Sequence, residues 1–283
     1  MAPTEPRALA PEDAAALTGL SAEAGWNQTA DDWRVILEHG AGEGVFAADG
    51  RPLASACAVP LTPRSRWICM VLVTPSARRQ GHATRLMARQ IAAVEGQGLV
   101  PGLDATELGR PVYERLGFRP LFALSRLGAD APHWPAADPG VGLRPIGADD
   151  LPAVAAYDAR ATGSDRLFLL AHLRTRRPAA AWLAERGGRI AGFVLGRDGV
   201  RASGIGPVVA DDPATAAALT AAAGRATPGP TMIDVPDGRT AFAAALAAAG
   251  FARQRGFTRM VKGDDPALDR TDRLYALAGP EFG

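Results

Sequence analysis

The sequence predicts a mixed α/β protein in which one fold with a mixed sheet occurs twice along the chain. The first observation is length, because 283 residues suit two domains of about 130–150 residues better than one. The second is an internal repeat. A short strand and an acidic helix start at 7–13 recur at 144–150, and a strand–helix–glycine–strand unit at 103–118 recurs at 233–251.

The composition is that of a soluble globular chain. Hydrophobic residues make up 47%, and 31 basic against 30 acidic side chains leave a net charge of +1, which disfavours a nucleic-acid binder. No apolar run approaches the ~18–20 residues that cross a membrane. Four histidines show no metal-ligand spacing, and Cys57 and Cys69 suit buried apolar positions on neighbouring strands. We therefore expect a cytoplasmic protein without a metal, a nucleic-acid partner or a membrane contact.

Proline-rich and glycine-rich segments suggest the domain boundaries. We expect a first domain at 1–127 and a linker at 128–140, which contains three prolines and no periodicity. A second domain is expected at 141–263, followed by a C-terminal tail at 264–283. A homo-oligomer is compatible with this organisation.

The central elements of each copy are also predictable. In the first copy, the nearly continuous apolar segment 67–73 predicts a strand in the middle of a sheet. A hairpin is predicted before it around Asp49-Gly50, and apolar residues at helical spacing predict a helix over 84–94 after it. In the second copy, 203–210 takes the place of the central strand.

The loop after the first central strand has the features of a phosphate-binding site. It contains Gly81 and the small Ala83, and arginines flank it where a helix begins. Small residues let a ligand approach the backbone closely, and the free N–H groups at a helix start attract an anion. An ordinary strand-to-helix turn with one glycine is the alternative.

This loop and a later segment together resemble the GNAT family, the GCN5-related N-acetyltransferases. The family's acyl-CoA loop, Q/R-x-x-G-x-G/A, is matched by Arg78, Gly81 and Ala83, and its Y-x-x-x-G-F segment by 113–118. The resemblance covers about residues 5–127. It implies two tandem GNAT-like folds and transfer of an acetyl group from acetyl-CoA, a cosubstrate, to a primary amine by direct attack.

The resemblance also implies which residues bind the cofactor. The central strand would offer backbone groups to the pantetheine arm, and the loop would hold the pyrophosphate. Thr106 stands where the family often has asparagine. The expected cofactor-binding residues are Val71, Leu72, Val73, Arg78, Arg79, Gln80, Gly81, His82, Ala83, Thr84 and Thr106.

Two residues are candidates for proton transfer. Tyr113 stands where the family's tyrosine protonates the departing CoA thiolate, a task that suits a phenol that is protonated at neutral pH. A tyrosine that only packs on its helix is the alternative. The glutamate that many members use as a base is missing. Asp104 is the nearest carboxylate, with a strand-end or capping role as its alternative, and proton removal through water also stays open.

The acceptor side is less defined. Trp26 and Asn27 lie in a loop that borders the acceptor site in the family, where an aromatic wall and a polar anchor suit a small acceptor. A tryptophan that seals the first helix pair is the alternative. The acceptor is expected to be a small-molecule or peptide amine. The sequence identifies neither the acceptor nor the length of the acyl group.

The second copy departs from the family's pattern at the functional positions. Asp211-Asp212 replaces the basic loop, and negative charge there would repel a pyrophosphate. Ala247 stands at the tyrosine position. We therefore expect a second half that keeps the fold and has lost cofactor binding. A non-catalytic acyl-CoA-binding regulatory or interaction protein is the alternative function.

Overall fold

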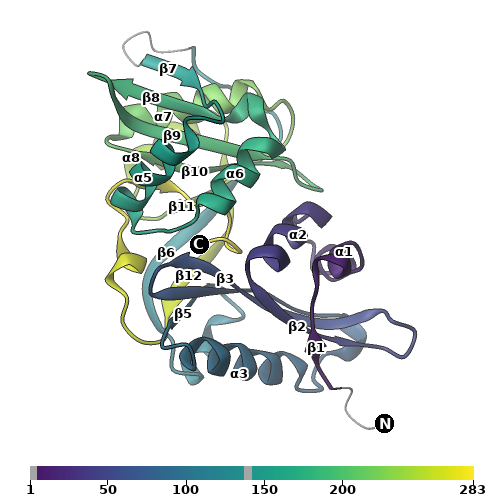
Figure 1. The fold of residues 1–283 in the computed structure, drawn as a ribbon. Helices are drawn as coiled ribbons and strands as arrows, with labels where there is room; N and C mark the ends of the chain where they lie inside the picture. The colour runs from purple at the N-terminus through teal and green to yellow at the C-terminus, as the bar shows by residue number, and fades with distance from the viewer. Residues whose placement is uncertain (1–4, 137–141) are drawn as a thin grey trace.

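The computed structural model describes residues 5–136 and 142–283, which form two α/β halves around a shared mixed sheet (Figure 1). The first half contributes β1 (Arg7–Ala8), β2 (Ala41–Phe46), β3 (Pro52–Thr62), β4 (Ser65–Val73), β5 (Val100–Thr106) and β6 (Arg119–Ala129). The second contributes β7 (Gly142–Pro145), β8 (Trp182–Arg186), β9 (Arg189–Arg197), β10 (Ser203–Ala210), β11 (Thr231–Pro236), β12 (Ala252–Val261) and β13 (Leu274–Ala276). The predicted fold class and the duplication are confirmed.

Helices pack on the strands of both halves. The first half has α1 (Ala14–Glu23), α2 (Ala30–His39), α3 (His82–Glu95) and α4 (Arg110–Arg115). The second half has α5 (Leu151–Thr162), α6 (Leu167–Arg176), α7 (Pro213–Arg225) and α8 (Thr240–Ala248). Short 3₁₀ helices are η1 (Pro11–Asp13), η2 (Pro75–Ala77), η3 (Pro178–Ala180) and η4 (Pro266–Asp269).

The sheet separates the core into two layers, because alternate side chains along a strand point to opposite faces. Along β3, Cys57 and Val59 belong to the core that includes α1 and α2, whereas Ala56 and Ala58 face residues of α3. Successive side chains of a strand point to opposite faces, so β3 is buried on both sides. The predicted helix over 84–94 is confirmed within α3, because its apolar residues Leu86, Met87, Ile91 and Val94 are all buried.

The two halves exchange strands in the middle of the sheet. The strand order is β1-β2-β3-β4-β5-β12-β6-β11-β10-β9-β8-β7. β12 comes from the second half and pairs with β5 and β6 of the first, while β6 pairs with β11 of the second. Neither half therefore has a complete sheet without the other.

The expected domain boundaries differ from the structure in two places. The expected linker begins inside β6, which continues to Ala129, and its residues 137–141 lie outside the described residues. The expected tail, 264–283, is not a loose tail. It contains η4 and β13, and Phe282 is 1% exposed because the segment packs back between the halves.

A buried group of charges joins the helices of the two halves. The Asp32 carboxylate on α2 accepts from Arg176 Nη1 at 3.0 Å and from Arg197 Nη1 at 2.6 Å, and its side chain is fully buried. Arg197 also pairs with Glu281. A buried charge costs several kcal/mol of desolvation unless it is paired, so these contacts fix how the halves meet.

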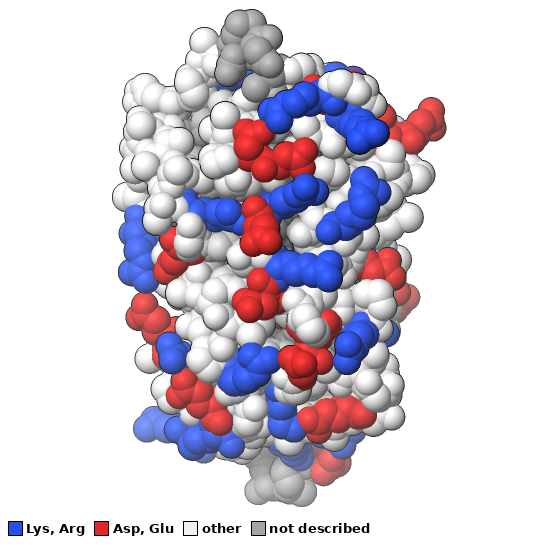
Figure 2. Space-filling model, turned by 90° about the vertical axis from the view of Figure 1, so that its left-hand side faces the viewer, with Lys and Arg blue, Asp and Glu red and all other residues white. Residues whose placement is uncertain are grey.

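The surface carries mixed charge. Figure 2 shows acidic and basic side chains mixed over one face, with no continuous patch of either sign. Within the two described ranges, no helix has both the length and the apolar character needed to cross a membrane.

Replacing Asp32 by asparagine should lower the free energy of unfolding by about 3–5 kcal/mol, because two buried guanidinium groups lose their shared carboxylate. Urea denaturation measures this difference. The matched control is Asp31→Asn on the same helix, where the pair with Arg34 is half exposed and the change should stay under about 1 kcal/mol. Equal effects of the two variants would contradict a special role for the buried group.

Candidate active site

The strands of the first half separate where the sequence predicts the donor site. β4 and β5 pair in parallel only from Ser65–Trp67 to Val100–Gly102 and then diverge. The backbone groups of β4 that face β5 beyond this point have no strand partner. Unpaired buried backbone groups are rare in proteins, so this opening is a place for a ligand to form hydrogen bonds with the strand.

A β-bulge shapes β4 at the opening. Ser55 pairs with Leu72 and Cys57 with Cys69, so two residues of β4 stand opposite one of β3. Met70, in the bulge, has φ +53°, a left-handed conformation that costs an unbranched L-residue about 1 kcal/mol. The Ser55 hydroxyl donates to its carbonyl at 2.7 Å. Such strain is common at functional sites, where it turns a backbone group toward a ligand.

The glycine loop leads directly into α3. Gly81 is the N-cap with φ +81°, Arg79 has φ +61°, and no side chain caps the helix. A Cβ built on Gly81 would meet no atom within 4 Å, and Arg79, Gln80 and Gly81 are exposed. The expected cofactor residues 78–84 therefore form an open helix start with free N–H groups. Such a start suits a phosphate.

Burial lowers the pKa of His82, the first residue of α3. The His82 side chain is 9% exposed, and burial followed by the charge of Arg85 lowers its pKa. A neutral imidazole adds no positive charge to the loop. Any phosphate there must therefore depend on the backbone and on arginine.

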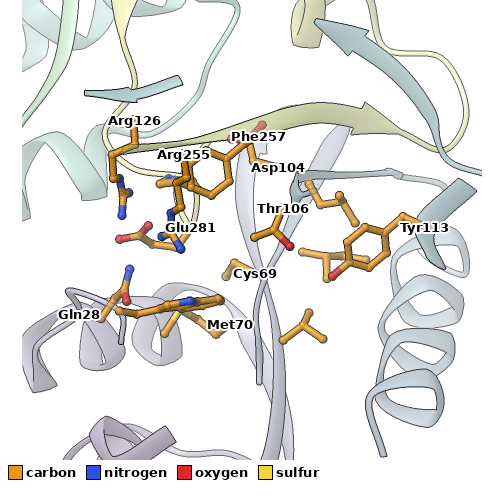
Figure 3. A pocket seen from close by; sticks show the side chains of 15 residues that line it. Gln28, Cys69, Met70, Asp104, Thr106, Tyr113, Arg126, Arg255, Phe257 and Glu281 are labelled. Atoms are coloured by element: carbon orange, nitrogen blue, oxygen red, sulfur yellow. The ribbon is translucent and has the colours of Figure 1, made fainter. Parts of the chain in front are cut away.

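A cavity of about 100 Å³ lies at the end of the opening (Figure 3). The first half contributes Trp26, Gln28, Cys69, Asp104, Thr106 and Tyr113 to its wall, and the bulge residues Met70 and Val71 complete this side. The strand exchange and the segment after β13 add Arg126, Arg255, Phe257, Pro280 and Glu281. Leu72 and Val73 lie further along β4 and are not part of the wall.

Tyr113 points into this cavity from α4 (Figure 3). Its ring packs edge-on against Phe118 at 6.1 Å, and burial raises the pKa of the phenol above its ordinary value. The hydroxyl therefore stays protonated at neutral pH. Thr106 starts the turn before α4, since its hydroxyl accepts from the Gly109 N–H at 3.2 Å.

Asp104 is in the cavity wall but is held in an ion pair. Arg259 donates to its two carboxylate oxygens at 3.1 and 3.0 Å, and the side chain is fully buried. Burial raises the pKa of Asp104, and the charge of Arg259 opposes that rise. With both oxygens occupied, the carboxylate positions Arg259 and β12 more readily than it accepts a proton.

The two predicted acceptor residues have different surroundings. Trp26 lines the cavity, but Asn27 does not. The Asn27 amide oxygen accepts from the Arg201 and Ala202 N–H groups at 2.8 and 3.1 Å, so it fastens a loop of the second half. The next residue, Gln28, faces the cavity instead and is 5% exposed.

Besides Gln28, four polar or aromatic residues of the wall have no counterpart in the sequence prediction: Arg126, Arg255, Phe257 and Glu281. They reach the cavity only because β6 and β12 exchange places and the chain returns after β13. No local pattern in the sequence marks any of them.

Cys69 also lines the cavity, opposite Cys57 in the strand register. Both cysteines are buried and free, which confirms their interpretation as small core residues. Burial raises the pKa of Cys57 to about 12 and that of Cys69 well above its ordinary value. Neither is therefore an effective nucleophile. Within the described ranges, no cluster of His, Cys, Asp and Glu could hold a metal ion.

The corresponding opening in the second half is filled by the chain itself. β10 and β11 pair in parallel only at their first residues and then diverge. β13 enters the gap and pairs with β10, and the Leu277 N–H donates to the Asp234 carbonyl at 2.9 Å. Asp212 caps α7 by accepting from the Thr215 N–H at 2.8 Å. Both places that a CoA would need are occupied.

A parallel strand pair that diverges and is followed by a helix occurs in both halves, and in the first half that helix starts at a glycine. This arrangement defines a tandem protein of the acyltransferase type. Family models for GNAT acetyltransferase domains match residues 41–120 and 154–276. Together they cover more than half of the chain, so the protein belongs to the GNAT acetyltransferase family.

Solved structures show the same fold. A Pyrococcus horikoshii protein provisionally named as an acetyltransferase is 19% identical with a TM-score of 0.81, and the match covers 100% of this chain and 97% of that one. A GCN5-related N-acetyltransferase from Sphaerobacter thermophilus is 19% identical with a TM-score of 0.66, over 93% and 98% of the chains. A tandem GNAT protein from the clavulanic acid pathway is 15% identical with a TM-score of 0.66, over 92% and 99%. Curated proteins gave no match.

Isothermal titration should give one acetyl-CoA bound per chain. In the second half, β13 fills the gap between β10 and β11, and Asp212 caps the start of α7. Two equivalent sites would contradict this assignment.

Replacing Gly81 by valine should abolish that binding, since the side chain would enter the open space beside the helix start and the positive φ disfavours a β-branched residue. Titration calorimetry measures the affinity. The control is Gly50→Val, which has a similar φ of +83° and open surroundings but lies in the hairpin between β2 and β3. Loss of affinity in both variants would indicate a general effect on the fold.

Proposed function

We propose that the first half moves an acetyl group from acetyl-CoA to a primary amine held in the cavity. The observation that carries the proposal is that three features occur along β4 and the loop that follows it. They are the open start of α3, the side of β4 that has no strand partner, and a cavity lined by Tyr113. This matches the path of a donor with a charged end, an extended arm and a reactive thioester.

The donor is bound along this opening. The N–H groups after Gly81 hold the pyrophosphate, and the arm adds to β4 as a further strand would. The bulge at Met70 and Val71 lies where the thioester then arrives. Backbone N–H groups there stabilise the negative charge that develops on the carbonyl oxygen.

The reaction is a direct transfer. The nitrogen of the neutral amine forms a bond with the acyl carbon, and the carbon–sulfur bond breaks with its electron pair on sulfur. Tyr113 gives its proton to the departing thiolate. The amine loses one proton in the step. Because the two carboxylates of the wall, Asp104 and Glu281, are each paired with an arginine, that proton leaves through water at the mouth of the cavity. Water then returns a proton to the Tyr113 phenolate, which restores the acid.

A second candidate function is a non-catalytic acyl-CoA-binding regulator. The same pairing favours it, since neither carboxylate in the wall is unpaired and ready to serve as a base. Release of free CoA thiol from acetyl-CoA, measured against a panel of amines, separates the two functions. Binding of CoA at micromolar concentration without turnover on any amine would favour the regulator.

Replacing Tyr113 by phenylalanine should lower the turnover number by roughly 10²–10⁴-fold, the range expected for loss of a general acid. A thiolate is a fairly good leaving group, so the lower end of this range is expected. Acetyl-CoA affinity and melting temperature should change little, because the ring keeps its packing on Phe118.

Rates at saturating acetyl-CoA across pH measure this effect. The wild-type rate should show no loss of the acid up to about pH 10, since burial raises the pKa of the phenol. The control is Tyr275→Phe, which removes a buried hydroxyl from the second half. Near wild-type turnover of the Tyr113 variant would reduce its role to packing.

A further inference from the structure

Two buried side-chain atoms in the described part of the chain have no hydrogen-bond partner, and both belong to residues that line the same cavity. They are Gln28 Oε1 and Arg255 Nε. Leaving a buried polar atom without a partner costs about 1–3 kcal/mol, so nearly all such atoms in proteins are satisfied. Because both residues line one cavity, a single ligand with a hydrogen-bond donor for Gln28 and an acceptor for Arg255 would satisfy both atoms.

Arg255 also differs from the arginines around it in having no carboxylate partner. Three other arginines at the cavity or beside it have carboxylate partners: Arg126 with Asp234, Arg197 with Asp32 and Glu281, and Arg259 with Asp104. Among the described residues, no carboxylate forms an ion pair with Arg255, and its Nε has no hydrogen-bond partner. Burial and the charge of Arg126 lower the pKa of Arg255, and the charges of Asp234 and Glu281 only partly oppose this. It stands opposite Arg126 in the register of β12 and β6, and like charges at such positions repel. An anion beside Arg255 would relieve this repulsion.

The donor does not supply this anion. The phosphates of CoA are expected at the start of α3, and the arm that continues along β4 is uncharged. The acceptor is therefore the source of the negative charge. Figure 3 shows Arg255 and Gln28 reaching into the cavity from opposite sides, with Glu281 between them.

We propose that the acceptor is a small amine that carries a carboxylate, as an amino acid does. This inference rests on the function proposed above. Arg255 binds the carboxylate, since a guanidinium offers paired N–H groups that match two carboxylate oxygens. The Gln28 amide oxygen accepts from an N–H of the acceptor's amine. The small volume of the cavity and the Phe257 ring in its wall favour a short acceptor over a protein chain.

Matched acceptor pairs test the proposal with the wild-type protein. Each pair contains an amino acid and a counterpart without its carboxylate: glycine and glycinamide, leucine and 3-methylbutylamine, phenylalanine and phenethylamine, methionine and 3-(methylthio)propylamine. In at least one pair, kcat/KM for the carboxylate member should exceed that of its counterpart by 10-fold or more. Equal or reversed preference in every pair overturns the proposal, as does faster reaction of phosphoethanolamine than of any amino acid.

Variants then test the assignment to Arg255. In Arg255→Gln, kcat/KM for the carboxylate member should fall roughly 10- to 100-fold more than for its counterpart, the usual value of a charge-assisted hydrogen bond. The matched control is Arg253→Gln on the same strand, whose side chain is 59% exposed. The control should keep the preference. A preserved preference in Arg255→Gln overturns the assignment.

Direct binding separates this inference from the proposed function. Titration calorimetry with CoA-saturated protein should detect the preferred amino acid in the wild type and a loss of affinity in Arg255→Gln. Binding without turnover would support the acceptor site and overturn acetyl transfer. Turnover of amines without a preference for a carboxylate would support acetyl transfer and overturn the acceptor site. If neither amino-acid binding nor turnover is detected, the inference is overturned.

Discussion

The insertion of β12 between β5 and β6 is the constraint on which the rest of the structure depends. It supplies hydrogen bonds to two strands of the first half that would otherwise be edges. It also carries Arg255 and Phe257 from the second half into the cavity wall of the first, and Arg259 against Asp104. The family's chemistry depends on one half, but the cavity in which it would occur is built by both.

Local sequence patterns predicted the elements whose formation depends on interactions between residues close together in the sequence. The central strands, the helix after the glycine loop and the duplication follow from periodicity, turn residues and capping. The repeated start at 7–13 and 144–150 even forms the same ion pair twice, Arg7 with Asp13 and Arg144 with Asp150, each at 2.7 Å. Such contacts span six residues and need no knowledge of the rest of the fold.

Contacts between distant segments could not be predicted in this way. Asp104 was a candidate base because it is the carboxylate nearest to the expected site, but the register of β12 on β5 places Arg259 directly opposite. Trp26, a predicted acceptor-site residue, lines the cavity, whereas the neighbouring Asn27 does not. A loop of the second half decides whether the Asn27 or the Gln28 side chain faces the cavity. The backbone N–H groups of Arg201 and Ala202 donate to the Asn27 side chain, and Gln28 turns inward instead.

The filled opening of the second half and the cavity of the first are linked by one segment. β13 fills the opening that a CoA would occupy, so the chain continues from there toward the other half. The Trp67 indole then donates to the Pro280 carbonyl at 2.8 Å, and Arg197 pairs with Glu281 in the cavity wall. A CoA bound in the second opening would displace β13, and with it the residues that close the cavity of the first half. The second half therefore contributes to the site because its own opening is closed.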